Sequence, residues 1–450
     1  MKEKVILDDR RIGLLLFKLS LPAFLGMSVM ALYNAVDTVF VGHYVGPLGI
    51  AALSVAFPVQ MCFLGLGQMI GMGAASLSSR SMGAGNLDRA RKALGNAIVS
   101  TLVLSAIVMA LVLPRVEGLS RMMGASPAVI PFVRTYLRLI LLGAFVQFSP
   151  IVLGNLIRAE GNARVPMQGM MLGAGLNIGL DALFITKMGM GIGGAALGTV
   201  ISQSVSTVYL CSHYILGHSP LGLRLRAMVP RIDVLTEIYT VGSASFARTV
   251  AGSLSVVIIN RTLALHGGDM AVSAFGILHR LAMFAVMPSM AIGQGLQPVL
   301  GYNYGARRPK EVLRSIWLAS GIAGLCSIGV FLMVFFSPQP LVKIFTDDPT
   351  LIPLASQAAK KMFLALYLVG FSAVGSLAFQ SMGRPLESFI TSVSRPALFM
   401  IPSVLILGHL MGANGVWLSF PLADVLTFLL TYLLLIPHLR RFRLEAMGER

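Results

Sequence analysis

The sequence predicts an all-α integral membrane protein with twelve transmembrane helices in two six-helix lobes. Of its 450 residues, 56% are hydrophobic and only 12% are charged, whereas a soluble domain carries roughly 25% charged residues. Apolar runs recur from end to end, and a helix needs about 20 such residues to cross a bilayer. Strands of a membrane barrel would instead alternate over short segments.

The apolar runs place the twelve helices in order along the chain. The first half contains spans near 13–42, 48–78, 93–113, 131–157, 163–185 and 191–216. The second half contains spans near 234–263, 270–300, 314–336, 352–380, 386–408 and 414–436. Proline occurs inside several of them, which predicts kinks at Pro22, Pro58, Pro150, Pro288 and Pro402.

The two halves repeat each other at an offset of 222 residues. The matching pairs are Gly46 and Gly268, Ala52 and Ala274, Gly71 and Gly293, Gly73 and Gly295, Gly83 and Gly305, and Gly161 and Gly383. Because six spans is an even number, both repeats share one orientation and are related by a pseudo-two-fold axis along the membrane normal. The repeat predicts an N-terminal lobe over 1–220, a cytoplasmic linker over 221–233 and a C-terminal lobe over 234–450.

The net charge of +17 reflects membrane topology. The basic residues lie in short loops, which argues against a nucleic-acid partner. With the N-terminus inside, 22 Lys and Arg residues fall on the cytoplasmic side and four in the opposite loops. The positive-inside rule therefore predicts a multi-pass plasma (inner) membrane protein with both termini cytoplasmic. The run after the charged N-terminus is too long for a cleaved signal peptide, so it is interpreted as the first span.

Acidic and amide side chains interrupt the apolar runs of the N-terminal half. Asp37 lies in the first span, and an ionised carboxylate at the bilayer centre costs about 2.5–3.5 kcal/mol on insertion scales. Asn177 and Asp181 lie four residues apart in the fifth span and so share one helix face. These oxygens predict a site for a small cation or a shared proton. A purely structural role, with Asn177 and Asp181 bonding across helices, is the alternative.

The C-terminal half lacks these acidic residues, because Ile259 and Ser403 stand at the positions that repeat Asp37 and Asp181. It carries deep charges instead. We expect Arg248 and Arg280 to pair with Asp424 or to line a cavity, and other arginines, including Arg395, to extend to the lipid headgroups.

The whole chain resembles the multidrug and toxic compound extrusion (MATE) transporters, in its two six-helix lobes and in the run Asn34–Gly42 of the first span. The resemblance implies a cation-coupled antiporter that exports amphiphilic, often cationic organic compounds by alternating access, with H⁺ or Na⁺ as the coupling ion. It implies that Asp37, Asn177, Asp181 and Thr199 bind the cation, the first three as metal ligands if it is Na⁺. The polar network around them would include Tyr136, Asn155 and Asn34.

Methionines at helical spacing, including Met283 and Met287, suit a pocket that accepts varied apolar cations. Packing or lipid contact explains them equally well. The expected partners are small organic molecules and the lipid bilayer; no organic cofactor is expected, and the chain is expected to be a monomer.

Two other classes of function remain as alternatives. The first is a flippase for lipid-linked precursors on a related two-lobe scaffold, which the deep arginines favour and the acidic residues disfavour. The second is an intramembrane enzyme, for which the chain has neither His-Glu-x-x-His nor a Gly-x-Ser-x-Gly in a suitable setting. No Walker A motif is present to support ATP hydrolysis.

Overall fold

The computed structural model describes residues 6–448, and the part of the chain that it describes consists of helices joined by short loops, without strands. Three of the basic residues that support the predicted topology, Lys2, Lys4 and Arg450, lie outside the described residues. The helices of the first half are η1 (Ile6–Asp8), α1 (Ile12–Tyr44), α2 (Pro47–Gly83), α3 (Leu87–Val112), η2 (Leu113–Arg115), α4 (Val116–Met122), α5 (Ile130–Leu142), α6 (Ala144–Ala159), α7 (Arg164–Asp181), η3 (Ala182–Lys187), α8 (Gly191–Ile215) and η4 (Leu225–Met228).

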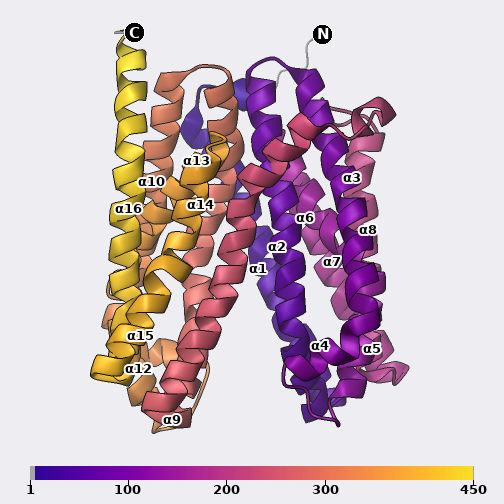
Figure 1. Ribbon diagram of the computed structural model, residues 1–450, viewed down its shortest axis with the longest axis vertical. Coiled ribbons are helices and arrows are strands. Elements are labelled where there is room, and N and C mark those ends of the chain that lie inside the picture. The colour runs from indigo at the N-terminus through magenta and orange to yellow at the C-terminus, as the bar shows by residue number, and fades with distance from the viewer. Residues whose placement is uncertain (1–5, 449–450) are drawn as a thin grey trace. The chain divides into compact units, whose positions relative to one another are not determined.

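The second half repeats the pattern (Figure 1). Its helices are α9 (Ile232–Gly305), α10 (Pro309–Phe336), α11 (Pro338–Lys343), α12 (Leu351–Met362), η5 (Leu366–Leu368), α13 (Val369–Ser381), α14 (Pro385–Val393), η6 (Ser394–Phe399), α15 (Met400–Met411) and α16 (Ala413–Met447). The segments η3 and η6 are π-helical.

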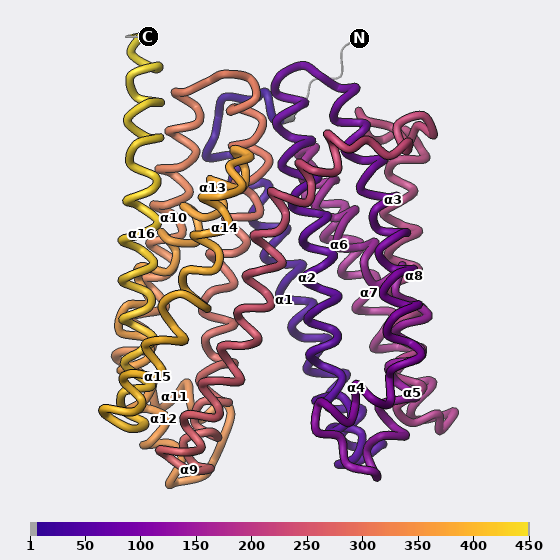
Figure 2. The backbone as a smooth tube through the Cα atoms, in the orientation of Figure 1, coloured from indigo at the N-terminus to yellow at the C-terminus, as the bar shows by residue number. Residues whose placement is uncertain are grey.

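These elements supply the twelve predicted spans. Eight helices are long and apolar enough to cross a membrane, and two bent pairs raise the number to ten. The 74-residue α9 holds two spans, because Gly268 adopts a φ of 64° that no helix continues through. The tube of α9 reverses direction at the lower end of the view (Figure 2). The 25 residues of α8 form the sixth span of the first repeat.

The sharpest bends lie away from the prolines that predicted kinks. The fourth span bends by 55° between α5 and α6, at Gly143, while Pro150 lies inside an uninterrupted α6. A Cβ at Gly143 would lie 2.8 Å from the side chain of Val200 in α8, so glycine is needed where the two helices meet. The repeat-related span bends by 47° between α12 and α13.

The chain divides into two compact units. The first contains Leu21–Gly242 and the second contains Asp9–Ser20 and Ser243–Arg450. The start of α1 thus packs with the second unit, and the start of α9 packs with the first. The boundaries predicted from the repeat place the start of α1 in the N-terminal lobe and the start of α9 with the C-terminal lobe. A repeat follows the order of residues along the chain, whereas these contacts join segments that are distant in sequence.

The start of α9 is fixed to the first unit by close backbone contact and by charge. A Cβ on Gly73 of α2 would lie 2.0 Å from the carbonyl oxygen of Ile238, and one on Gly242 would lie 1.9 Å from the carbonyl oxygen of Met69. Glu237 forms ion pairs of 2.7 Å with both Arg80 and Arg89. Neither glycine position can accommodate a side chain without displacing backbone.

The linker before α9 is held by the side chain of Asn96 in α3. Its Nδ2 donates to the carbonyl oxygens of Ala227 at 3.3 Å and Val229 at 3.2 Å. Its Oδ1 accepts from the backbone N–H of Arg231 at 2.8 Å. One buried amide thus satisfies three backbone groups of a segment that lacks a strand or long helix of its own.

Each unit has its own apolar core. In the first unit the core surrounds Phe148 and includes Phe63, whose ring meets that of Phe148 edge-on at 5.4 Å. In the second unit it surrounds Phe275, with Trp417 and Phe420 of α16. Burial of these large side chains fixes the helices that carry the polar groups described next.

Candidate cation site

The structure brings the two acidic residues of the N-terminal half together. Asp37 of α1 and Asp181, the last residue of α7, lie within hydrogen-bond reach of each other through their carboxyl groups. Asp181 is 0% exposed. Among the described residues, the Oδ1 atom of each carboxyl group is buried without a hydrogen-bond donor. Two carboxylates cannot stay in contact in this environment unless a proton or a cation lies between them.

Asn177 and Thr199 complete the site from α7 and α8, which pack side by side (Figure 1). In the orientation that satisfies both polar atoms of its amide, Asn177 donates to Asp181 Oδ2 at 3.1 Å. It also accepts from the backbone N–H of Thr199 at 3.2 Å. The Thr199 hydroxyl donates to the carbonyl oxygen of Ala195 at 3.0 Å, which leaves an oxygen lone pair available to a ligand.

Small residues allow α7 and α8 to approach so closely. A Cβ on Gly198 would lie 2.7 Å from Asp181 Oδ1, so the carboxyl group occupies the space that a side chain would fill. Farther along the same pair of helices, Ser206 donates to the carbonyl oxygen of Gly169 at 2.9 Å. The helix changes to the π-helical η3 directly after Asp181. Such changes in helix type often accompany functional residues.

Two tyrosines lie near the acidic pair. The charges of Asp37 and Asp181 both act on Tyr33 and on Tyr136. The hydroxyl of buried Tyr136 accepts from Gln60 Nε2 of α2 at 2.6 Å. Sequence reasoning found Tyr136 but missed Tyr33 and Gln60, because a single aromatic or amide residue in an apolar run gives no signal of its own.

The remaining polar residues of the predicted network lie elsewhere. Asn155 of α6 donates to Gln68 Oε1 at 3.2 Å and accepts from Arg158 at 2.8 Å, in a second buried network. Asn34 is exposed and donates to the Met30 carbonyl oxygen of its own helix at 2.9 Å. Neither has a described contact with the acidic pair.

In the C-terminal half, the predicted pairing of Asp424 with Arg248 or Arg280 is wrong. Asp424 of α16 is paired with Arg395 of η6, with 2.5 Å between its Oδ1 and Nε. The carboxyl side chain is 2% exposed and the guanidinium side chain 39% exposed. Where we expected Arg395 to extend to the lipid headgroups, its Nε is held by a buried carboxylate of its own lobe.

The other C-terminal candidates are dispersed. Arg280 is exposed and Arg248 is partly buried, both in α9, and neither has an ion pair with a described residue. Met283 is exposed and Met287 is partly buried on the same helix. The described contacts do not join these four side chains into one cluster.

Comparison with known proteins places this arrangement in a family. The family model described as MatE matches residues 22–183 and again residues 246–406. The chain belongs to the MatE family. One match falls in each half, which agrees with the internal repeat, and each match lies within the first five spans of its repeat.

Relatives of this MatE chain span almost its whole length. A "Multidrug export protein MepA" of Staphylococcus aureus strain N315 is 28% identical over 432 residues, covering 95% of this chain and 94% of the relative. The protein of that name from Staphylococcus haemolyticus is 26% identical over 409 residues, covering 90% and 89%.

Solved structures agree with the fold. The structure titled "Crystal structure of MATE in the straight conformation" has a TM-score of 0.91 at 26% identity, covering 96% of this chain and 97% of that chain. An outward-facing "multidrug resistance MATE family transporter of the MOP superfamily" has a TM-score of 0.91 at 26% identity, covering 96% of each chain. The protein is thus a multi-pass membrane transporter with the two-lobe MATE fold.

Proposed function

We propose that this MatE protein is a cation-coupled multidrug efflux antiporter of the plasma (inner) membrane. It exchanges H⁺ or Na⁺ for amphiphilic, often cationic organic compounds by alternating access. The observation that carries the proposal is the contact between the carboxyl groups of Asp37 and Asp181, each with one buried oxygen that lacks a donor among the described residues. The relatives that are named multidrug export proteins support the class of exported compound.

The acidic pair couples the cation to a conformational change through differential affinity. Without a cation the two carboxylates repel each other; a bound cation removes that repulsion and draws α1 toward α7. A conformation in which the two side chains meet therefore binds the cation more tightly than one in which they are apart. For each net charge that one exchange cycle moves inward, a membrane potential of 100 mV contributes about 2.3 kcal/mol, which sustains a concentration ratio of several tens.

The oxygen atoms of the site could bind either H⁺ or Na⁺. Asp37, Asp181, the Asn177 amide and the Thr199 hydroxyl are hard oxygen ligands of the kind that alkali and alkaline-earth cations prefer. A proton requires only the direct contact between the two carboxyl groups. That contact favours a shared proton in this conformation, and entry of Na⁺ would require the carboxyl groups to separate.

Transport in vesicles with separate ion gradients tests the proposal. Purified protein is reconstituted with a fluorescent lipophilic cation, and a pH gradient and a Na⁺ gradient are imposed one at a time. We expect one of the two to drive accumulation of the dye, and protein-free vesicles to show none. Dye movement that is the same without a gradient as with either gradient would contradict coupling.

The flippase alternative is tested in the same vesicles. Arg395 is neutralised by Asp424, which weakens the case for a large cationic cavity in the C-terminal lobe. We expect a fluorescent lipid-linked sugar to remain in its original leaflet under conditions in which the dye moves. Movement of the lipid-linked sugar without movement of the dye would favour the flippase.

A further inference from the structure

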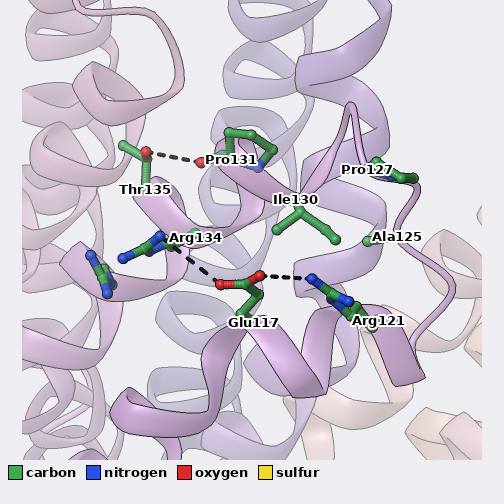
Figure 3. Close-up of a pocket in the computed structure, with 9 residues that line it drawn as sticks. Glu117, Arg121, Ala125, Pro127, Ile130, Pro131, Arg134 and Thr135 are labelled. Atoms are coloured by element: carbon green, nitrogen blue, oxygen red, sulfur yellow. Dashed lines mark hydrogen bonds and ion pairs between the residues drawn. The ribbon is translucent and has the colours of Figure 1, made fainter.

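A cavity of about 770 Å³ lies between α4 and α5 in the first unit. Its charged lining residues come from both helices: Glu117 and Arg121 from α4 and Arg134 from α5, which Figure 3 labels, and Arg138, also from α5. Within this unit it lies at the opposite end from the basic turn between α2 and α3 (Figure 1). None of these four residues has a described contact with Asp37 or Asp181.

The lining carries an excess of positive charge. Glu117 is shared by Arg121, at 2.9 Å, and Arg134, at 4.0 Å. Arg138 forms no ion pair with any residue in 6–448. Three arginines and one carboxylate therefore line the cavity. The side chains of Arg121 and Arg134 are 67% and 47% exposed, so their remaining donors are accessible to a ligand.

The position of these arginines in the predicted bilayer makes an anionic ligand favourable. Arg138 follows the start of α5 by eight residues, which is about 12 Å along a helix. A headgroup region is only about 5–8 Å deep on each side of the hydrocarbon. Since the predicted span begins near residue 131, we expect Arg138 near the hydrocarbon boundary or inside it. An unpaired guanidinium there is costly, and a phosphate matches its forked donors with two hydrogen bonds.

The exposed face of α5 carries basic residues followed by an apolar residue, the order that complements the headgroup and acyl chain of a phospholipid. Arg134, Arg138 and Leu142 follow at intervals of four residues and so lie on one helix face. Leu142 is 62% exposed, and it lies farther from the start of the helix than the arginines. A headgroup on Arg134 and Arg138 would therefore place its acyl chain along an apolar surface, which a free phosphate ion would not use.

Comparison of the two repeats shows that the arginines of this cavity are particular to the N-terminal lobe. At the offset of 222, Lys343 and Lys360 stand at the positions that repeat Arg121 and Arg138. Lys360 lies over the ring of Phe335, with Nζ 5.8 Å from its centroid, and so already has a partner. Lysine also lacks the planar fork that holds a phosphate with two bonds. The C-terminal lobe thus has positive charges at both of these positions, and one of them, Lys360, already contacts an aromatic ring of the fold.

We propose that the cavity between α4 and α5 binds the phosphate headgroup of an anionic phospholipid, through Arg134 and Arg138 with Arg121 at the rim. The predicted topology places this lipid in the outer leaflet. The site is distinct from the acidic pair, and lipid binding is measured without transport.

The test compares lipid retention by purified wild-type protein and by the double variant Arg134→Gln, Arg138→Gln. Delipidated protein in detergent is titrated with phosphatidylglycerol or phosphatidylcholine, and bound lipid is counted by native mass spectrometry. We expect wild-type protein to bind phosphatidylglycerol at least about tenfold more tightly than phosphatidylcholine, and the double variant to lose that preference. The matched control Lys343→Gln, Lys360→Gln removes the same charge from the repeat of the cavity in the C-terminal lobe and should retain the preference.

Three results would overturn the proposal. They are an unchanged preference in the double variant, an equal loss in the lysine control, and displacement of phosphatidylglycerol by equimolar inorganic phosphate, which would assign the site to a free anion. Should the double variant fail to fold, Arg138→Lys serves in its place. That variant keeps the charge and removes the fork, and we expect it to weaken phosphatidylglycerol binding several-fold.

Discussion

At the scale of single residues, the proposed coupling depends on how one carboxyl group is accommodated. Asp181 is fully buried between α7 and α8, bonded by Asn177 on one side and in contact with Asp37. Gly198 gives it room, because a Cβ there would lie 2.7 Å from its Oδ1. The absence of a side chain at Gly198 is therefore part of the candidate cation site.

Replacing Gly198 by alanine should impair coupling without unfolding the protein. The new methyl group displaces the Asp181 carboxyl from Asn177 and Asp37, and loss of one such hydrogen bond to a charged group is worth about 1.5–3 kcal/mol. We expect gradient-driven dye transport to fall about tenfold or more. Gly179→Ala on α7 is the matched control, since nothing lies within 4 Å of its added Cβ. Equal transport by the two variants would contradict the proposed geometry.

Asn34 should be dispensable for coupling, although the family resemblance implied a place for it in the polar network. Its side chain is exposed and bonds only to the Met30 carbonyl oxygen among the described contacts. We expect Asn34→Ala to transport the dye at the wild-type rate, and Gln60→Ala, which removes the donor to Tyr136, to transport it more slowly. Initial rates in vesicles with matched protein content measure both. A large loss in Asn34→Ala would restore Asn34 to the site.

At the scale of elements, the spans and their repeat could be predicted because long apolar runs and glycine offsets are periodic in the sequence. The contacts between spans could not. Arg395 and Asp424 are 29 residues apart and bond across η6 and α16, and the π-helical turn that carries Arg395 has no sequence signal. Gln60 and Tyr136 are 76 residues apart. Such partners depend on helix rotation, which tertiary packing decides.

The buried amide of Asn96 should contribute measurably to stability. Asn96→Ala leaves three backbone groups of the linker without a partner, and an unsatisfied buried polar group costs about 1–3 kcal/mol. We expect a melting temperature several degrees lower in detergent, with Asn34→Ala unchanged. An unaltered melting temperature in Asn96→Ala would show that water replaces these bonds.

At the scale of the whole molecule, each compact unit contains a segment that the repeat assigns to the other half. The start of α9 belongs to the first unit through Gly73, Gly242 and the ion pairs of Glu237. The start of α1 belongs to the second unit through Gly295, where a Cβ would lie 2.3 Å from Ser20 Oγ. The repeat alone could not predict this exchange, because both segments continue into spans of their own half.

Substituting the glycines at the close contacts between α2 and α9 should destabilise the first unit. Gly73→Ala places a methyl group against the carbonyl oxygen of Ile238, and overpacking of this kind costs about 1–3 kcal/mol. We expect a lower melting temperature for Gly73→Ala and for Gly242→Ala, whereas Gly252→Ala, which meets nothing within 4 Å, should match wild type. Identical melting of all three would contradict the close packing.

The acidic pair itself is tested most directly by gradient-driven dye transport in vesicles containing Asp37→Asn or Asp181→Asn. Thr38→Val, next to Asp37 but bonded only to the Asn34 carbonyl oxygen of its own helix among the described contacts, is the control. We predict that both asparagine variants insert and fold normally yet lose gradient-driven accumulation, while Thr38→Val keeps it. Undiminished accumulation in both asparagine variants would contradict the claim that Asp37 and Asp181 form the coupling site.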